Sequence, residues 1–266
     1  MTTFSPRTVE PRAFRRWAKD AAWLILHRPV RSTLIALVLG AGSVALQFLG
    51  SHMAAFDSVP SILSLLLICV GFYGLVAILV TAATILAPTI DPIRDSEPPG
   101  ANAVPVTMQS LILASSWFVG AYLVLAVVEM LQTDDLRLLR DLLSSPAITV
   151  VVTTMGLLAP AGMWPGFVSM RLRSGIRDCT ALVSRGLALN PRMHASIMGL
   201  AYFTSIPMTI AARSLEPSLL GFIVGPYILF VATWTYCGYC DVFEHRTPKP
   251  KLASALAPRL ASAHSS

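Results

Sequence analysis

Residues 33–50 read TLIALVLGAGSVALQFLG, eighteen residues without one charged side chain. The hydrocarbon core of a bilayer is about 30 Å thick, so a helix needs roughly 20 apolar residues to cross it. Working outward from this stretch, five further apolar stretches reach or approach that length. We therefore predict an all-α, polytopic membrane protein with six transmembrane helices. The expected spans are about 33–50, 61–88, 108–131, 148–170, 195–212 and 218–239.

The composition excludes other classes of protein. Hydrophobic residues make up 55% of the 266 residues and charged residues 13%, about half the roughly 25% typical of a soluble domain. A water-soluble fold of this size needs more polar surface, and a disordered chain has far less apolar content. Four cysteines are too few for a disulfide scaffold.

The distribution of Lys and Arg predicts how the chain is oriented, because short loops rich in these residues stay in the cytoplasm. With six spans, 17 of the 20 Lys and Arg residues fall on one side and 3 on the other. The fifth span is short and contains Pro207, and a five-span alternative would put the termini on opposite sides. The charge split favours six spans with both termini cytoplasmic. The net charge of +6 then indicates attraction to anionic lipid headgroups and not to nucleic acid.

Two segments that precede spans are predicted to form amphipathic helices. Phe14, Trp17, Ala21 and Leu24 recur at helical spacing, and we expect these side chains to insert at the membrane surface. A second apolar stripe lies in residues 172–187. Basic residues accompany both stripes as candidate contacts for anionic lipid, namely Arg12, Arg15, Arg16, Arg171, Arg173 and Arg177.

A proline follows each amphipathic segment, at Pro29 and Pro191. Proline disfavours helix in the residue before it, so each one predicts a break between a surface helix and a span. The expected organisation is a cytoplasmic segment at 1–31 that carries an amphipathic helix, a six-helix domain at 32–245 and a disordered cytoplasmic tail at 246–266.

Three motifs carry a resemblance to a known family. The chain has Trp-Leu-x-Leu-x-x-Pro at 23–29, a Gly followed by Ala-Leu-x-Ser within 175–184, and Tyr-x-Asp-x-Phe at 239–243. In these motifs the chain resembles the proteobacterial inner-membrane proteins related to YciC and to the glycerophosphodiester phosphodiesterase membrane domain. The resemblance implies six helices and an inner-membrane location. It implies no catalytic residues, because the phosphodiesterase chemistry of those fusions lies in a separate soluble domain.

Few residues are candidates for chemistry inside the membrane. Glu129 is the one acid within an expected span, and it is either an interfacial side chain that reaches water or a proton or cation site. Cys237 and Cys240 form a CxxC at the inner end of the last span. Packing cysteines, a metal site and a redox pair are the alternatives for this motif. We expect no cofactor and no bound metal.

The fourth span has the most irregular composition. Pro160 and Pro165 each remove a backbone hydrogen bond, so the helix is expected to kink or break. Such a break lines a substrate cavity in transporters and is elsewhere a packing kink. The glycine pairs of spans four and six permit close helix approach, and we hypothesise that these two spans pair. These candidate packing residues are Gly162, Gly166, Gly221 and Gly225.

These features favour a non-catalytic integral membrane protein, acting as a subunit or an assembly or accessory factor that packs with other membrane proteins or with itself. The scarcity of buried polar groups and the small-residue faces support this function. A small-solute transporter or a lipid-handling membrane protein is the alternative, because of the proline-containing span and the basic inner surface. An enzyme is not expected, since the sequence has no HExxH, GxSxG or phosphate-loop motif.

Overall fold

The regular structure is helical throughout the described part of the chain, as the sequence predicts. The computed structural model describes residues 5–10, 12–54, 62–93, 103–133 and 147–246. Its helices are α1 (Ala13–His27), α2 (Pro29–Ala54), α3 (Ile62–Leu86), the 3-10 turn η1 (Ala87–Ile90), α4 (Ala103–Thr133), α6 (Ala147–Leu172), α7 (Ile176–Leu189), α8 (Pro191–Ser214) and α9 (Pro217–Val242).

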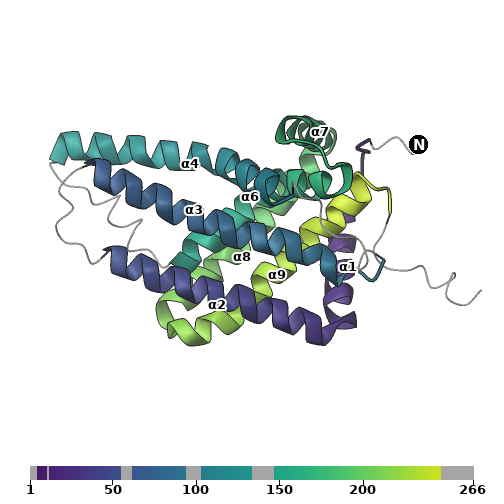
Figure 1. Ribbon diagram of the computed structural model, residues 1–266, viewed down its shortest axis with the longest axis horizontal. Coiled ribbons are helices and arrows are strands. Elements are labelled where there is room, and N and C mark those ends of the chain that lie inside the picture. Colours follow the sequence, from purple (N-terminus) through teal and green to yellow (C-terminus); the bar gives the residue numbers. More distant parts are fainter. Residues whose placement is uncertain (1–4, 11, 55–61, 94–102, 134–146, 247–266) are drawn as a thin grey trace, which may run out of the picture.

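The long helices form an elongated bundle around α9. Figure 1 shows α2, α3 and α4 along the long axis, with the short helices α1 and α7 at one end. α9 packs against α1, α2, α3 and α6. Residues 231–243 are all buried, so the second half of α9 forms the centre of the core. We call the end that holds α1, α7 and the last turns of α9 the polar end.

Two described helices are long and apolar enough to cross a membrane on length and composition. They are Pro29–Leu49 within α2 and Leu219–Val242 within α9. Shorter apolar helices cover Gly74–Ile90 and Ala103–Leu113. α2 and α9 therefore supply the two membrane-crossing candidates, and they also pack on each other over much of their length.

The apolar face of α1 packs on protein, which corrects the expectation that it inserts into lipid. Trp17, Ala21 and Leu24 are buried at 1% exposure or less, and Phe14 is half-buried. The physical reason lies in α9, where Gly238 leaves room for an indole ring. A Cβ at Gly238 would lie 2.9 Å from two ring carbons of Trp17. The carbonyl of Phe14 also accepts a hydrogen bond of 3.0 Å from Nε1 of Trp234.

Prolines mark the two predicted breaks between a short helix and a long one. α1 ends at His27 and α2 begins at Pro29, while α7 ends at Leu189 and α8 begins at Pro191. Proline suits the first helical position because its missing N–H would have no partner there. Both breaks are therefore confirmed.

Glycine lets α2 and α9 approach to backbone contact. A Cβ at Gly225 would overlap the carbonyl oxygen of Ala36 and lie 2.8 Å from the nitrogen of Gly40. A Cβ at Gly221 would lie 2.8 Å from Cγ2 of Val44. Such an approach is possible only where neither helix has a side chain at the contact.

The expected pairing of spans four and six is confirmed, because α6 packs against α9, but Gly166, Gly221 and Gly225 have other helices as their nearest neighbours. Gly221 and Gly225 of α9 face α2, while the glycines of α6 face α4. A Cβ at Gly166 would lie 3.0 Å from Cβ of Thr107, and the carbonyl of Gly162 accepts a 2.8 Å hydrogen bond from Ser110 Oγ. Each glycine motif lies at a close helix contact, but the motif of α9 contacts α2 and the motif of α6 contacts α4.

The expected break in the fourth span does not occur. α6 runs without interruption from Ala147 to Leu172 through Pro160 and Pro165, and both prolines are buried. The hydrogen bond from Ser110 of the neighbouring α4 reaches the same turns of α6. The prolines remove the donors to the carbonyls of Gly156 and Ala161, so the Ser110 bond ties α6 to α4 and does not replace a bond lost to proline.

The α2–α9 contact predicts a large effect of one added side chain. Gly225→Leu should destabilise the protein by about 3 kcal/mol or prevent folding, because its Cβ has no space beside Ala36. Gly74→Leu is the matched control, since no atom lies within 4 Å of a Cβ at Gly74. Thermal melting in mild detergent measures both variants, and equal melting temperatures would contradict the described contact.

Candidate functional site

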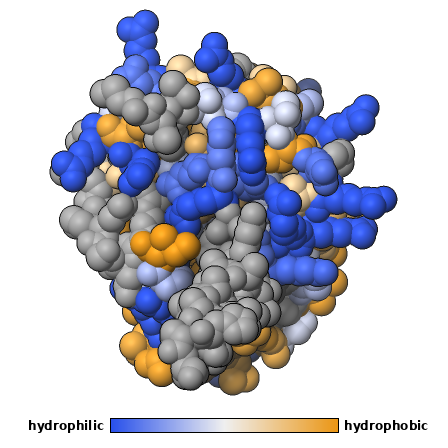
Figure 2. All heavy atoms as spheres, turned by 90° about the vertical axis from the view of Figure 1, so that its right-hand side faces the viewer, coloured by the Kyte–Doolittle hydropathy of each residue, from blue (hydrophilic) through white to orange (hydrophobic). Residues whose placement is uncertain are grey.

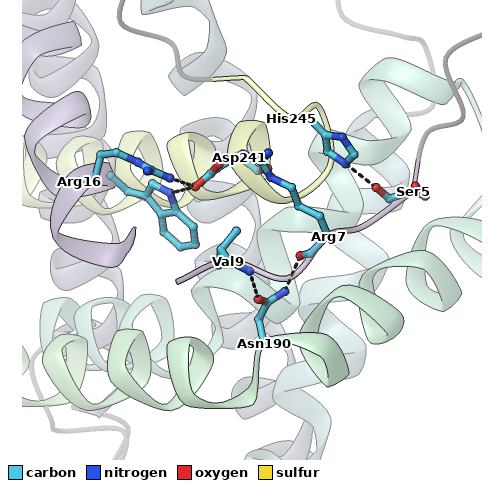
Figure 3. Close-up of polar contacts among 8 residues, drawn as sticks. Ser5, Arg7, Val9, Arg16, Asn190, Asp241 and His245 are labelled. Carbon is cyan, nitrogen blue, oxygen red and sulfur yellow. Dashed lines mark hydrogen bonds and ion pairs between the residues drawn. The ribbon is translucent and has the colours of Figure 1, made fainter. Parts of the chain in front are cut away.

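Polar and charged side chains converge at the last turns of α9. Asp241 on α9 and Asp91 after η1 are buried at 1% and 0% exposure. Burying a carboxylate costs several kcal/mol unless ion pairs and hydrogen bonds compensate. The partners of these two acids therefore define the site, which is drawn in part in Figure 3.

Asp241 holds the N-terminal segment and α1 against α9. Its two carboxylate oxygens accept from the guanidinium groups of Arg7 and Arg16, and Oδ2 also accepts a 2.8 Å hydrogen bond from Nε1 of Trp17. Nε of Arg7 donates to the Asp241 carbonyl at 2.8 Å. The backbone N–H of Arg7 donates to the carbonyl of Val242 at 2.9 Å. One carboxylate thus binds residues more than 220 positions away in the chain.

Asn190, between α7 and α8, binds the other side of the N-terminal segment. Its Oδ1 accepts from the backbone N–H of Val9 at 2.7 Å, and its Nδ2 donates to the carbonyl of Arg7 at 2.9 Å. Nδ2 also donates to the carbonyl of Gly186 at 2.9 Å. Figure 3 shows Arg7 between Asn190 and Asp241, with His245 directed at the Ser5 carbonyl. The N-terminal segment is therefore bound on both sides.

Asp91 joins the end of η1 to the residues that follow α9. Its Oδ2 accepts from the hydroxyl of Tyr236 and from Nη1 of Arg246, each at 2.8 Å. Its Oδ1 accepts from the backbone N–H of Ile93 at 3.0 Å. Nε of Arg246 also donates to Glu244 at 2.6 Å. This second network fixes the C-terminal turn beside η1.

An aromatic layer lies beneath the two networks. Trp164 and Phe167 of α6 contact Phe243, Tyr236 and Tyr239, with ring centroids 5.3–5.4 Å apart. Nε1 of Trp164 donates to the carbonyl of Thr235 at 3.0 Å. The layer shields the carboxylates from water on the core side and ties α6 to α9.

The charges of this cluster balance. Three carboxylates, of Asp91, Asp241 and Glu244, meet three guanidinium groups, of Arg7, Arg16 and Arg246. Each buried carboxylate accepts from fixed donors of this chain, so the arrangement can hold four segments together. We call this set of six charged residues, with Trp17, Tyr236 and Asn190, the terminal clasp.

The CxxC motif lies in the core next to the terminal clasp. Cys237 and Cys240 are both fully buried, and Cys179 is on the buried face of α7. Burial raises the pKa of the Cys179 thiol, which disfavours the reactive thiolate. Within the described residues, no three His, Cys, Asp or Glu side chains lie close enough together to hold a metal ion.

The predicted lipid-contacting arginines lie at the polar end. Arg12 and Arg15 are exposed on α1, while Arg171, Arg173 and Arg177 are exposed around the start of α7. Figure 2 views this end of the molecule and shows that hydrophilic side chains cover much of it. Arg16 has a second role that the sequence analysis missed, since it binds Asp241. The side chain of Glu129 lies outside the described residues.

The contacts that bring Asp91, Asp241, Arg7 and Asn190 together were not predicted from the sequence. Asp91 and Asp241 each follow directly on a long apolar stretch, and that position was a usable signal. A lone carboxylate at the end of a buried helix needs a cation nearby. The identity of the paired cation depends on contacts between segments that are distant in the chain. Local sequence periodicity does not predict such contacts.

No known family, curated protein or solved structure matches this chain.

The terminal clasp predicts that one buried carboxylate holds the N-terminal segment in place. Asp241→Asn should lower the free energy of unfolding by about 2 kcal/mol, because hydrogen bonds to a charged partner contribute about 1.5–3 kcal/mol. In this variant water hydrates the half-exposed side chains of Arg7 and Arg16, which limits the decrease in the free energy of unfolding. The variant should also speed up trypsin cleavage after Arg7, Arg12 and Arg16.

Glu10→Gln is the control for this prediction, since Glu10 is exposed in the same segment. It should leave both the melting temperature and the cleavage rate unchanged. If Asp241→Asn behaved like this control, the terminal clasp would not hold the segment.

Proposed function

We propose that the chain is a non-catalytic integral protein of a bacterial inner membrane, with six spans and both termini in the cytoplasm. In this proposal it is a subunit or accessory factor that packs with other membrane proteins. The observation that carries the proposal is the separation of two surfaces. Large apolar side chains are exposed along the sides of the bundle, and arginines gather at the polar end.

The apolar side surface is extensive. Leu34 and Val38 on α2, Phe203 and Ile210 on α8, and Phe222 on α9 are each about 60–70% exposed. Monomeric soluble proteins rarely expose contiguous apolar surface of this kind, whereas lipid tails or partner helices cover it without cost. Five of the six expected spans fall within one long described helix each, and the second overlaps α3 and runs into η1, which supports a six-span topology.

The polar end supports the proposed orientation. Exposed arginines on α1 and around the start of α7 suit the cytoplasmic face, where anionic headgroups attract basic segments. Both termini lead toward this end, since Arg7 binds Asp241 near the end of α9. The motif resemblance to YciC-related inner-membrane proteins implies six helices and an inner-membrane location, which agrees with this proposal.

The state of the buried acids supports a non-catalytic role. A general acid or base needs a carboxyl group that a substrate can reach. The Asp91 and Asp241 carboxylates are buried and bind guanidinium groups, an indole and a phenol of this chain. These carboxylates therefore stabilise the fold through ion pairs and hydrogen bonds.

The proposed function predicts a protein partner. The tagged chain, expressed at its native level and extracted gently from its own membrane, should retain one defined membrane protein at fixed stoichiometry in native mass spectrometry. A known complex of the same membrane, extracted in parallel, shows that the conditions preserve assemblies. Recovery of the chain alone, while that complex stays intact, would contradict the subunit role.

A further inference from the structure

An apolar groove follows the contact between α2 and α9. It has a volume of about 810 Å³, within the range of roughly 300–1,000 Å³ that is typical of small-molecule sites. Its lining runs along α2 from Pro29 to Phe48 and includes Gly221 and Phe222 of α9. At a rise of 1.5 Å per residue, these positions on α2 span about 28 Å. The hydrocarbon of one leaflet is about 15 Å thick, so an extended acyl chain fits within the groove.

Small residues create this groove. Ala36 and Gly40 of α2 meet Gly221 and Gly225 of α9 at backbone distance, so the line of contact there has no side chain larger than a methyl group. Larger side chains in the lining are exposed, among them Phe222 at 65% and Phe48 at 66%. The groove therefore opens to the surroundings of the bundle.

The polar side chains of the lining are confined to one end of the groove. Ser32 and Thr33, in the first turns of α2, are the lining residues that carry a hydroxyl group. Ser32 is 3% exposed, and its Oγ has no hydrogen-bond partner within the protein. A buried hydroxyl without a partner costs about 1–3 kcal/mol. A ligand that offers an oxygen acceptor here would remove this cost.

Two arginines precede this end of the groove in the chain. Arg28 and Arg31 come directly before Ser32 in the chain, at the start of the span Pro29–Leu49. That position is the depth at which phosphate and ester groups of a phospholipid lie. The groove thus offers an apolar channel, then a hydroxyl donor, then positive charge, in the same order as the parts of an anionic phospholipid.

We propose that this groove is a binding site for one anionic phospholipid. An acyl chain lies along the line of contact between α2 and α9, the Ser32 hydroxyl donates to an ester or phosphate oxygen, and Arg28 and Arg31 attract the headgroup. The site is distinct from general attraction at the polar end, because it requires a shaped channel. It rests on the proposed membrane location but not on a protein partner.

Native mass spectrometry of the delipidated full chain, titrated with phosphatidylglycerol or phosphatidylcholine, tests the site. The wild-type chain should bind one phosphatidylglycerol in preference to phosphatidylcholine. Ala41→Phe fills the groove and should weaken this binding at least tenfold. Ser32→Ala should weaken it about two- to tenfold, the effect of one lost hydrogen bond. Val38→Phe is the matched control on α2, since Val38 is exposed and does not line the groove.

Each outcome has a definite meaning. Equal binding of the two lipids, or equal loss in Ala41→Phe and Val38→Phe, would overturn the site. Recovery of a partner helix that competes with phosphatidylglycerol would also overturn it, while supporting the proposed subunit function. Failure of the chain to partition into membranes at all would instead contradict the proposed function.

Discussion

The contact between α2 and α9 is the constraint on which the rest of the structure depends. Gly225 brings the backbone of α9 against Ala36 and Gly40, and no other residue type fits at this position. This contact fixes the two candidate membrane-crossing helices of the described chain as an antiparallel pair. It also leaves the outer side of the pair hollow, because residues small enough to permit the approach are too small to fill the groove.

The terminal clasp adds a second set of contacts to α9, at the end opposite to the glycine contact. The first half of α9 has glycines that receive α2, and its last turns have Gly238 and Asp241, which receive the indole of Trp17. α1 is therefore a packed element of the bundle as well as a basic surface helix. Since Asp241 binds Arg7 and Arg16 together, the N-terminal segment and α1 are held by one carboxylate. Arginine at this end thus has two functions, pairing inside the fold and charge at the surface.

Local patterns predicted the helices well and their partners poorly. Proline at Pro29 and Pro191 located two helix breaks, because the effect of proline acts on its immediate neighbour. The amphipathic stripe of α1 was also found, but its burial against α9 was not, since a stripe does not identify what covers it. The same limit applies to the glycine motifs, which indicated close helix contacts but did not identify α2 as the neighbour of Gly225. The terminal clasp joins residues 234 positions apart, a distance that periodicity does not reach.

Selective labelling of two cysteines tests the proposed membrane-spanning arrangement most directly. In a chain whose own cysteines are replaced by alanine, Ser58→Cys lies in the loop that the charge pattern places outside, and Ser184→Cys is exposed on α7. A membrane-impermeant maleimide added to intact cells, with the outer membrane permeabilised, should label Ser58→Cys. Ser184→Cys should react only after the inner membrane is opened. Equal labelling of both positions before that step would contradict a bundle that crosses the membrane with its polar end inside.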